Sequence, residues 1–174
     1  MAAPADNVVV YAINNAEQSV IRGEKNKAAT AALRKAGVGT KEGDRVTLVG
    51  YSEGALVAAN LAAKGDFKVS GVVSIGGQVG NVAVPKSVPV LSIEHSLDIP
   101  AKLDLKDNPN GKNWLSVTLP SANPFNAHDI ANYLTSAKHV DSAGYAAVAS
   151  KLQEMLPSTP QTVTGNLYRT QLIG

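Results

Sequence analysis

A serine stands between two glycines where an apolar run gives way to an alanine-rich one, in the order Gly50-Tyr51-Ser52-Glu53-Gly54. This order fits G-x-S-x-G, a pattern in which a strand turns sharply into a helix and lifts a serine hydroxyl above the end of a sheet. A hydroxyl held there can attack an acyl group, and the amide N–H of Glu53 would point to where an oxyanion forms. We therefore expect Ser52 to be a nucleophile.

The same five letters also arise by chance in a chain rich in glycine and serine, so their context matters. The residues before the serine, Arg45–Tyr51, read as a buried strand, and Glu53–Lys64 reads as a helix that ends before Gly65. A strand before the serine and a helix after it are what the sharp turn requires, so the context favours the nucleophile.

A nucleophile on such a turn predicts an acid and then a histidine later in the chain, each on a loop after a later strand. Asp98 lies just beyond the predicted strand Val88–Ile93 and is the best candidate for the acid. Glu94 and Asp104 are its rivals. The alternative role for Asp98 is that of a turn or helix-capping residue.

The three histidines differ in their place relative to that acid. His95 precedes the acid and breaks the expected order, so we interpret it as a loop or supporting residue. His128 follows the fifth predicted strand across a short loop, where the base is expected, while His139 is expected on the surface of a helical segment. In this arrangement His128 takes the Ser52 proton and Asp98 fixes the tautomer of the imidazole. The alternative is that neither histidine is the base.

The oxyanion hole needs a second N–H besides that of Glu53, from a loop after an early strand. That loop is Ala12–Ala16, in which Asn14 or Asn15 offers backbone or side-chain donors. We expect Asn14 in this position, although the two asparagines would equally suit a plain turn.

Apolar runs alternate with helical stretches along the chain, and the runs are apolar on both faces. The expected strands are Asn7–Ile13, Arg45–Tyr51, Val69–Ile75, Val88–Ile93 and Trp114–Leu119, and the expected helices are Lys25–Ala36, Glu53–Lys64 and a C-terminal region with Tyr145, Val148, Leu152 and Met155 on its sheet-facing side. The tail, residues 157–174, is expected to add an edge strand. This pattern predicts an α/β fold, a three-layer α/β/α sandwich with a mostly parallel sheet of about five strands and no room for a lid.

Residues 1–174 fit one domain of ordinary size, and the first six residues do not have the pattern of a signal peptide. The chain could still be a domain cut from a longer precursor. Its formal charge is only +2, without a basic cluster, so we expect no nucleic acid partner. No apolar run is long enough to predict a transmembrane segment. The sequence does not indicate the oligomeric state.

Metal and cofactor sites are not expected. Cysteine is absent, and His128-Asp129 and His139-x-Asp141 lack metal-ligand spacing. The glycines at 76, 77 and 80 follow a strand but have neither the dinucleotide order nor a phosphate-binding lysine, so we expect a loop lining the sheet edge near Ser52. Trp114 is expected to pack at the start of a strand.

The stretch GYSEGALVAANLA, residues 50–62, resembles the GYSQGA turn of cutinase-like and related serine esterases of the α/β-hydrolase superfamily. VPVLSIEHSLDIPA, residues 88–101, resembles a bacterial subgroup of such hydrolases with a histidine and an aspartate just before a proline. A later histidine followed by a tyrosine, here His128 and Tyr133, is also similar to that subgroup. The resemblance covers residues 45–135 and implies Ser52 as nucleophile, Asp98 as acid and His128 as base.

The chain departs from that family in its short N-terminal part and in lacking the cysteines of fungal cutinases. The resemblance implies cleavage of a small-molecule or lipid ester, without a cofactor. It also implies a secreted or cell-envelope location, with the cytoplasm still open. Thioesterase, peptidase and acyltransferase reactions use the same groups, and the alternative is an inert α/β-hydrolase-like module used for binding.

Overall fold

The computed structural model describes residues 6–11, 22–39, 44–99, 101, 108–121, 123–142 and 145–156, which hold five strands and four helices. In chain order these elements are β1 (Asp6–Tyr11), α1 (Arg22–Lys35), β2 (Arg45–Tyr51), α2 (Glu53–Lys64), β3 (Val69–Ile75), β4 (Val90–His95), β5 (Trp114–Leu119), α3 (Ile130–Ser142) and α4 (Ala146–Met155).

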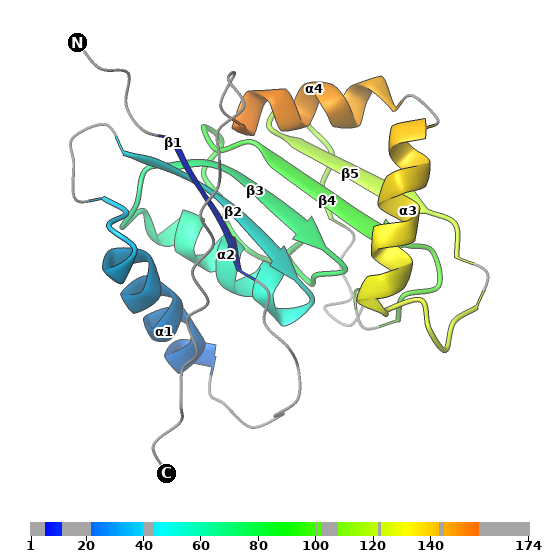
Figure 1. Ribbon diagram of the computed structural model, residues 1–174, viewed down its shortest axis with the longest axis horizontal. Helices are drawn as coiled ribbons and strands as arrows, with labels where there is room; N and C mark the ends of the chain where they lie inside the picture. Colours follow the sequence, from blue (N-terminus) through cyan, green and yellow to red (C-terminus); the bar gives the residue numbers. More distant parts are fainter. Residues whose placement is uncertain are drawn as a thin grey trace.

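The five strands form one sheet in the order β1-β2-β3-β4-β5, and every neighbouring pair is parallel (Figure 1). Gly50 of β2 lies opposite Tyr11 on one side and Ser74 on the other. Because parallel strands end at the same edge of a sheet, the segments after β2, β3, β4 and β5 all begin there. Ser52 follows β2, which is second in the order of strands.

Two apolar cores cover the two faces of the sheet. Helices α1 and α2 pack on one face with Leu33, Val46, Val72 and Val90, while the residues on the opposite side of each strand, such as Val73 and Leu91, pack beneath α3 and α4 (Figure 1). The alternation along β3 and β4 follows from the two-residue period of a strand buried on both faces. The three-layer α/β/α fold expected from the sequence is therefore confirmed.

Several element boundaries differ from the expected ones. Helix α1 begins earlier, at Arg22, and β4 runs from Val90 to His95 instead of starting at Val88. The Val88 N–H is used in a turn with the Pro85 carbonyl, and Pro89 has no N–H to donate to the ladder. At the other end His95 pairs with Leu119, which extends the strand up to the loop.

One of the four residues expected on the sheet-facing side of the C-terminal helical region, Tyr145, lies off that side. Val148 and Met155 are buried, but Tyr145 precedes α4 and is 41% exposed. Its place at the helix end, ahead of the first turn, takes it off the sheet-facing side. Residues 12 and 13 of the first expected strand and the expected edge strand in residues 157–174 lie outside the described residues.

At Gly50 the neighbouring backbone leaves no space for an added Cβ. A Cβ there would lie 2.3 Å from the Gly54 carbonyl oxygen and 2.4 Å from the Ala55 nitrogen, and both are backbone atoms that cannot rotate away. Gly50→Ala should lower the free energy of unfolding by about 2 kcal/mol or more, measured by urea denaturation. Gly111→Ala, where a Cβ meets nothing within 4 Å, is the matched control. Equal unfolding midpoints for the two variants would contradict the expectation.

Candidate active site

The turn after β2 holds Ser52 in an unusual backbone conformation. Its φ is 54° and its ψ is −125°, and it is the one non-glycine residue with positive φ in the described part of the chain. Its N–H donates to the Ile75 carbonyl at 2.8 Å, and its own carbonyl accepts from the Ala55 N–H at 3.1 Å. Such a conformation costs on the order of 1–3 kcal/mol and persists because the surrounding contacts fix it.

The glycines after β3 pack directly against this turn. A Cβ on Gly77 would lie 2.2 Å from the Ala55 Cβ and 3.2 Å from the Ser52 carbonyl oxygen. Gly76 has a φ of +57°, which glycine adopts without strain. The loop therefore lines the sheet edge beside Ser52, as the sequence predicted.

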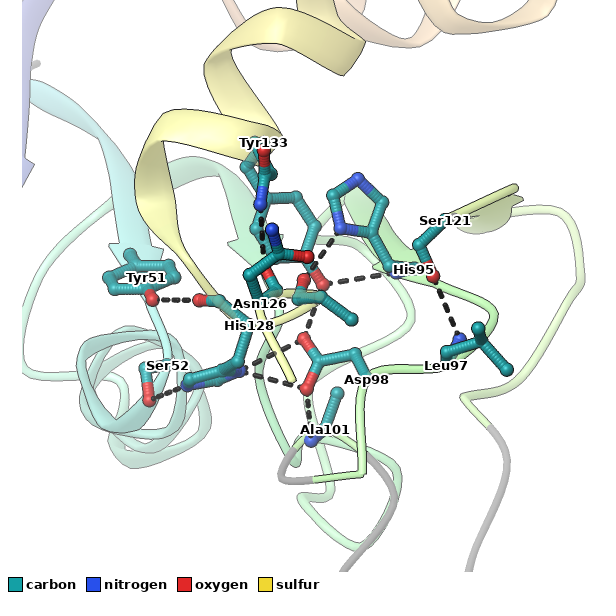
Figure 2. A network of polar contacts seen from close by, with 12 residues as sticks. Tyr51, Ser52, His95, Leu97, Asp98, Ala101, Ser121, Asn126, His128 and Tyr133 are labelled. Atoms are coloured by element: carbon teal, nitrogen blue, oxygen red, sulfur yellow. Dashed lines mark hydrogen bonds and ion pairs between the residues drawn. The ribbon is translucent and has the colours of Figure 1, made fainter. Parts of the chain in front are cut away.

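The segment between β5 and α3 brings His128 over the turn (Figure 2). Its Nε2 lies 2.8 Å from the Ser52 Oγ, and its Nδ1 lies 2.9 Å from each carboxylate oxygen of Asp98. The Tyr51 hydroxyl donates to the His128 carbonyl oxygen, and the two rings stack with centroids 5.3 Å apart. Tyr51 thus holds both the backbone and the ring of His128.

The partners of the two ring nitrogens of His128 determine which of them carries hydrogen. A carboxylate only accepts, so the His128 Nδ1 carries hydrogen and donates to Asp98. In the neutral imidazole the Nε2 is then unprotonated and accepts the Ser52 O–H. This is the tautomer that a base needs in order to remove a proton from the serine.

Asp98 is fully buried, with an exposed fraction of 0%. Besides His128, it accepts the Tyr133 O–H at 2.6 Å and the Ala101 N–H at 3.2 Å. Burial, the largest single influence, raises the pKa of Asp98, but the hydrogen bonds from His128, Tyr133 and Ala101 together bring this pKa below its ordinary value. The carboxyl group is therefore held ionised inside the protein.

Tyr133 and His95 form a pair behind Asp98 that sequence reasoning did not predict. Their rings stack with centroids 4.0 Å apart and planes 8° apart, and the His95 N–H donates to the Tyr133 oxygen at 3.0 Å. The His95 Nδ1 donates to the Ala127 carbonyl at 2.6 Å, and its Nε2 lies 2.8 Å from the Ser136 Oγ. The sequence signal for the tyrosine is its place after the histidine in the subgroup that the chain resembles, and this signal does not indicate a role.

Glu53 is the first residue of α2, so its N–H is at the positive end of that helix, where backbone N–H groups lack partners within the helix. Its carboxylate makes an ion pair with Lys25 of α1. The sequence does not predict this ion pair because the two residues are far apart in the chain. Asn14, the expected second oxyanion donor, lies outside the described residues.

The rival candidates lie elsewhere. The Glu94 carboxylate accepts from the Asn108 side chain, and Asp104 is outside the described residues. His139 is an exposed residue of α3. His95 is buried at the end of β4, and its ring binds the Ala127 carbonyl on the loop that carries His128. The structure thus brings together Ser52, His128 and Asp98.

Further findings concern metal binding and membrane spanning, which the sequence does not predict. Within the described ranges no group of three or more histidine, cysteine, aspartate or glutamate side chains could hold a metal ion. None of the helices in those ranges is long and apolar enough to cross a membrane. Trp114 is buried at the start of β5, and its indole N–H donates to the Ser92 Oγ at 3.0 Å, so it packs as expected.

Comparison with known proteins gives a distant structural likeness. No family model and no curated protein matches the chain. A solved structure described as "Structure of an alpha-beta serine hydrolase homologue from Coxiella burnetii" is similar, with 16% sequence identity and a TM-score of 0.41. The alignment covers 63% of this chain and 55% of that one, so the chain spans little more than half the length of the protein it matches.

The low pKa of Asp98 predicts a pH-dependent contribution to stability. Because this pKa is lower in the folded protein than in the unfolded chain, the unfolded chain takes up the proton first as the pH falls. The contribution is therefore present above about pH 4 and is lost as the pH falls through that value toward the folded pKa. The difference in unfolding free energy between the wild type and Asp98→Asn should shrink from about pH 6 to about pH 3, followed by urea denaturation. A difference that stays constant over this pH range would contradict the lowered pKa of Asp98.

Proposed function

We propose that residues 1–174 form one catalytic domain, a serine hydrolase that cleaves carboxylic esters through an acyl-enzyme on Ser52. His128 is the base and Asp98 the orienting acid. The observation that supports this most directly is the unbroken chain of contacts from the Ser52 Oγ to the His128 Nε2, and from its Nδ1 to the buried Asp98. Three groups of these types in this order match the geometry of acyl transfer.

The contacts suggest how each step runs. The Ser52 oxygen attacks the ester carbonyl carbon while His128 accepts the serine proton, and the ion pair with Asp98 offsets the charge of the imidazolium. His128 then gives the proton to the departing alcohol as the carbon–oxygen bond breaks, which leaves the acyl group on Ser52. A water molecule, deprotonated by His128, attacks the acyl-enzyme and releases the acid and the free serine.

The oxyanion formed in both steps would be stabilised by the Glu53 N–H at the start of α2. A carboxylate on the residue that supplies this donor would oppose the negative charge, but Lys25 neutralises it in an ion pair. Asn14 remains the proposed second donor. The ester substrate, small molecule or lipid, rests on the resemblance of the turn, since thioesterases and acyltransferases use the same groups.

A fluorophosphonate probe tests the nucleophile. The Ser52 oxygen should displace fluoride from phosphorus, and intact-mass and peptide spectra should place the adduct on Ser52. Ser52→Ala should give no adduct, whereas Ser116→Ala, which removes a hydroxyl on β5 held by Pro109, should label like the wild type. A folded wild-type protein that takes no label would instead support the inert binding module.

Removal of the base should abolish ester hydrolysis. His128→Ala should reduce kcat for p-nitrophenyl acetate by roughly a thousandfold or more, because the variant loses the Nε2 that lies 2.8 Å from the Ser52 Oγ and accepts its proton. His139→Ala, which changes an exposed histidine of α3, is the matched control and should keep most of the activity. Loss of activity in His139→Ala with retention in His128→Ala would show that the wrong histidine has been assigned.

A further inference from the structure

The hydroxyl of Tyr133 has only one possible direction for its proton. It lies 2.6 Å from the Asp98 Oδ2, which only accepts, and 3.0 Å from the His95 backbone nitrogen, which only donates. The tyrosine must therefore accept from His95 and donate to Asp98. Asp98 thus accepts a hydrogen bond from a hydroxyl group on α3 in addition to the one from the imidazole of His128.

The ring that carries this hydroxyl is also fixed. Tyr133 is 3% exposed and stacks on His95, whose imidazole is itself held by the Ala127 carbonyl and by Ser136. A Cβ at Gly76 would lie 3.0 Å from the Tyr133 oxygen and 3.1 Å from the Asp98 Oδ2. The absence of a side chain at position 76 therefore leaves space for this hydrogen bond.

We propose that Tyr133 is a positioning residue, which locks the Asp98 carboxylate in the orientation that presents both its oxygens to the His128 Nδ1. The Ala101 N–H binds the Oδ1 and Tyr133 binds the Oδ2, so each oxygen has one fixed donor and keeps a lone pair for the imidazole. Without the tyrosine, the Oδ2 would lose its fixed donor, and the carboxylate would be less restrained against rotation about its bond to Cβ. This inference rests on the proposed hydrolase function and adds to it the means by which α3 controls the acid.

The surroundings of Asp98 agree with this role. The titratable groups that face the acid–tyrosine pair are His128 on the loop after β5, Tyr51 at the end of β2, and Glu94 and His95 on β4. Burial first, and then the hydrogen bond to Asp98, raises the pKa of Tyr133, so its hydroxyl keeps its proton. Donation from that hydroxyl is also among the causes that lower the pKa of Asp98.

Tyr133→Phe tests the proposal because it keeps the ring stacked on His95 and removes only the oxygen. After active sites are counted with the fluorophosphonate, kcat for a p-nitrophenyl ester should fall about tenfold or more, the range expected for a lost hydrogen bond to a charged group. KM should stay within about twofold, because Tyr133 contacts Asp98 and not the substrate. Tyr145→Phe, on an exposed tyrosine at the start of α4, is the matched control and should match the wild type. A Tyr133→Phe enzyme with wild-type kcat for each active site would overturn the proposal, even if its stability were lower.

A second measurement does not depend on turnover. The carbon-13 signal of the Asp98 carboxyl group, followed by NMR against pH, should titrate at higher pH in Tyr133→Phe than in the wild type. A carboxyl signal that titrates at the same pH in both proteins, or in neither, would overturn the proposal. If the wild type failed to label with the fluorophosphonate but the carboxyl titration moved as expected, the hydrolase function would fail while Tyr133 would still be shown to hold the acid.

Discussion

The burial of one carboxylate governs the arrangement of the site. An ionised group cut off from water costs several kcal/mol unless charged and polar partners replace the lost hydration. Asp98 receives that replacement from His128, Tyr133 and the Ala101 N–H, which belong to different segments of the chain. Each of these segments must therefore be in place before Asp98 can be buried as a carboxylate, so the site and the packing of α3 on the sheet form together.

The parallel sheet makes this convergence possible. Because all five strands run in the same direction, the segments that carry Ser52, Gly76, Asp98 and His128 leave the sheet at a single edge. The β3–β4 connection contributes Val79 and Val88 to the core on the α1 and α2 side, and after β5 the chain crosses to the other face to form α3 and α4. That crossing passes over the edge where Ser52 is held, and it carries His128 at the end of the loop and Tyr133 in the first turns of the helix.

Local patterns predicted the parts of the site that depend on local constraints. The turn at Ser52 requires small residues at 50 and 54 because the strand and the helix nearly touch, so its letters carry steric information that a single sequence reveals. Chain order then pointed to Asp98 and His128 on the loops where the structure has them. The partners of Lys25 and His95 could not be found in this way, since Glu53 and Ser136 lie far along the chain. For Tyr133 the sequence indicates only a place after His128, and the packing of α3 determines that its side chain reaches Asp98.

Two histidines close to one carboxylate have different chemical capacities because their ring nitrogens have different partners. His95 is 1% exposed, its Nδ1 bonds to the Ala127 carbonyl and its Nε2 to Ser136, so neither nitrogen is directed toward Ser52. The His128 side chain is 24% exposed, and it presents its Nε2 to Ser52 with the other nitrogen fixed by Asp98. The Ala127 carbonyl that His95 binds belongs to the residue just before His128. His95 therefore holds the loop that carries His128 and stacks on Tyr133, which donates to Asp98.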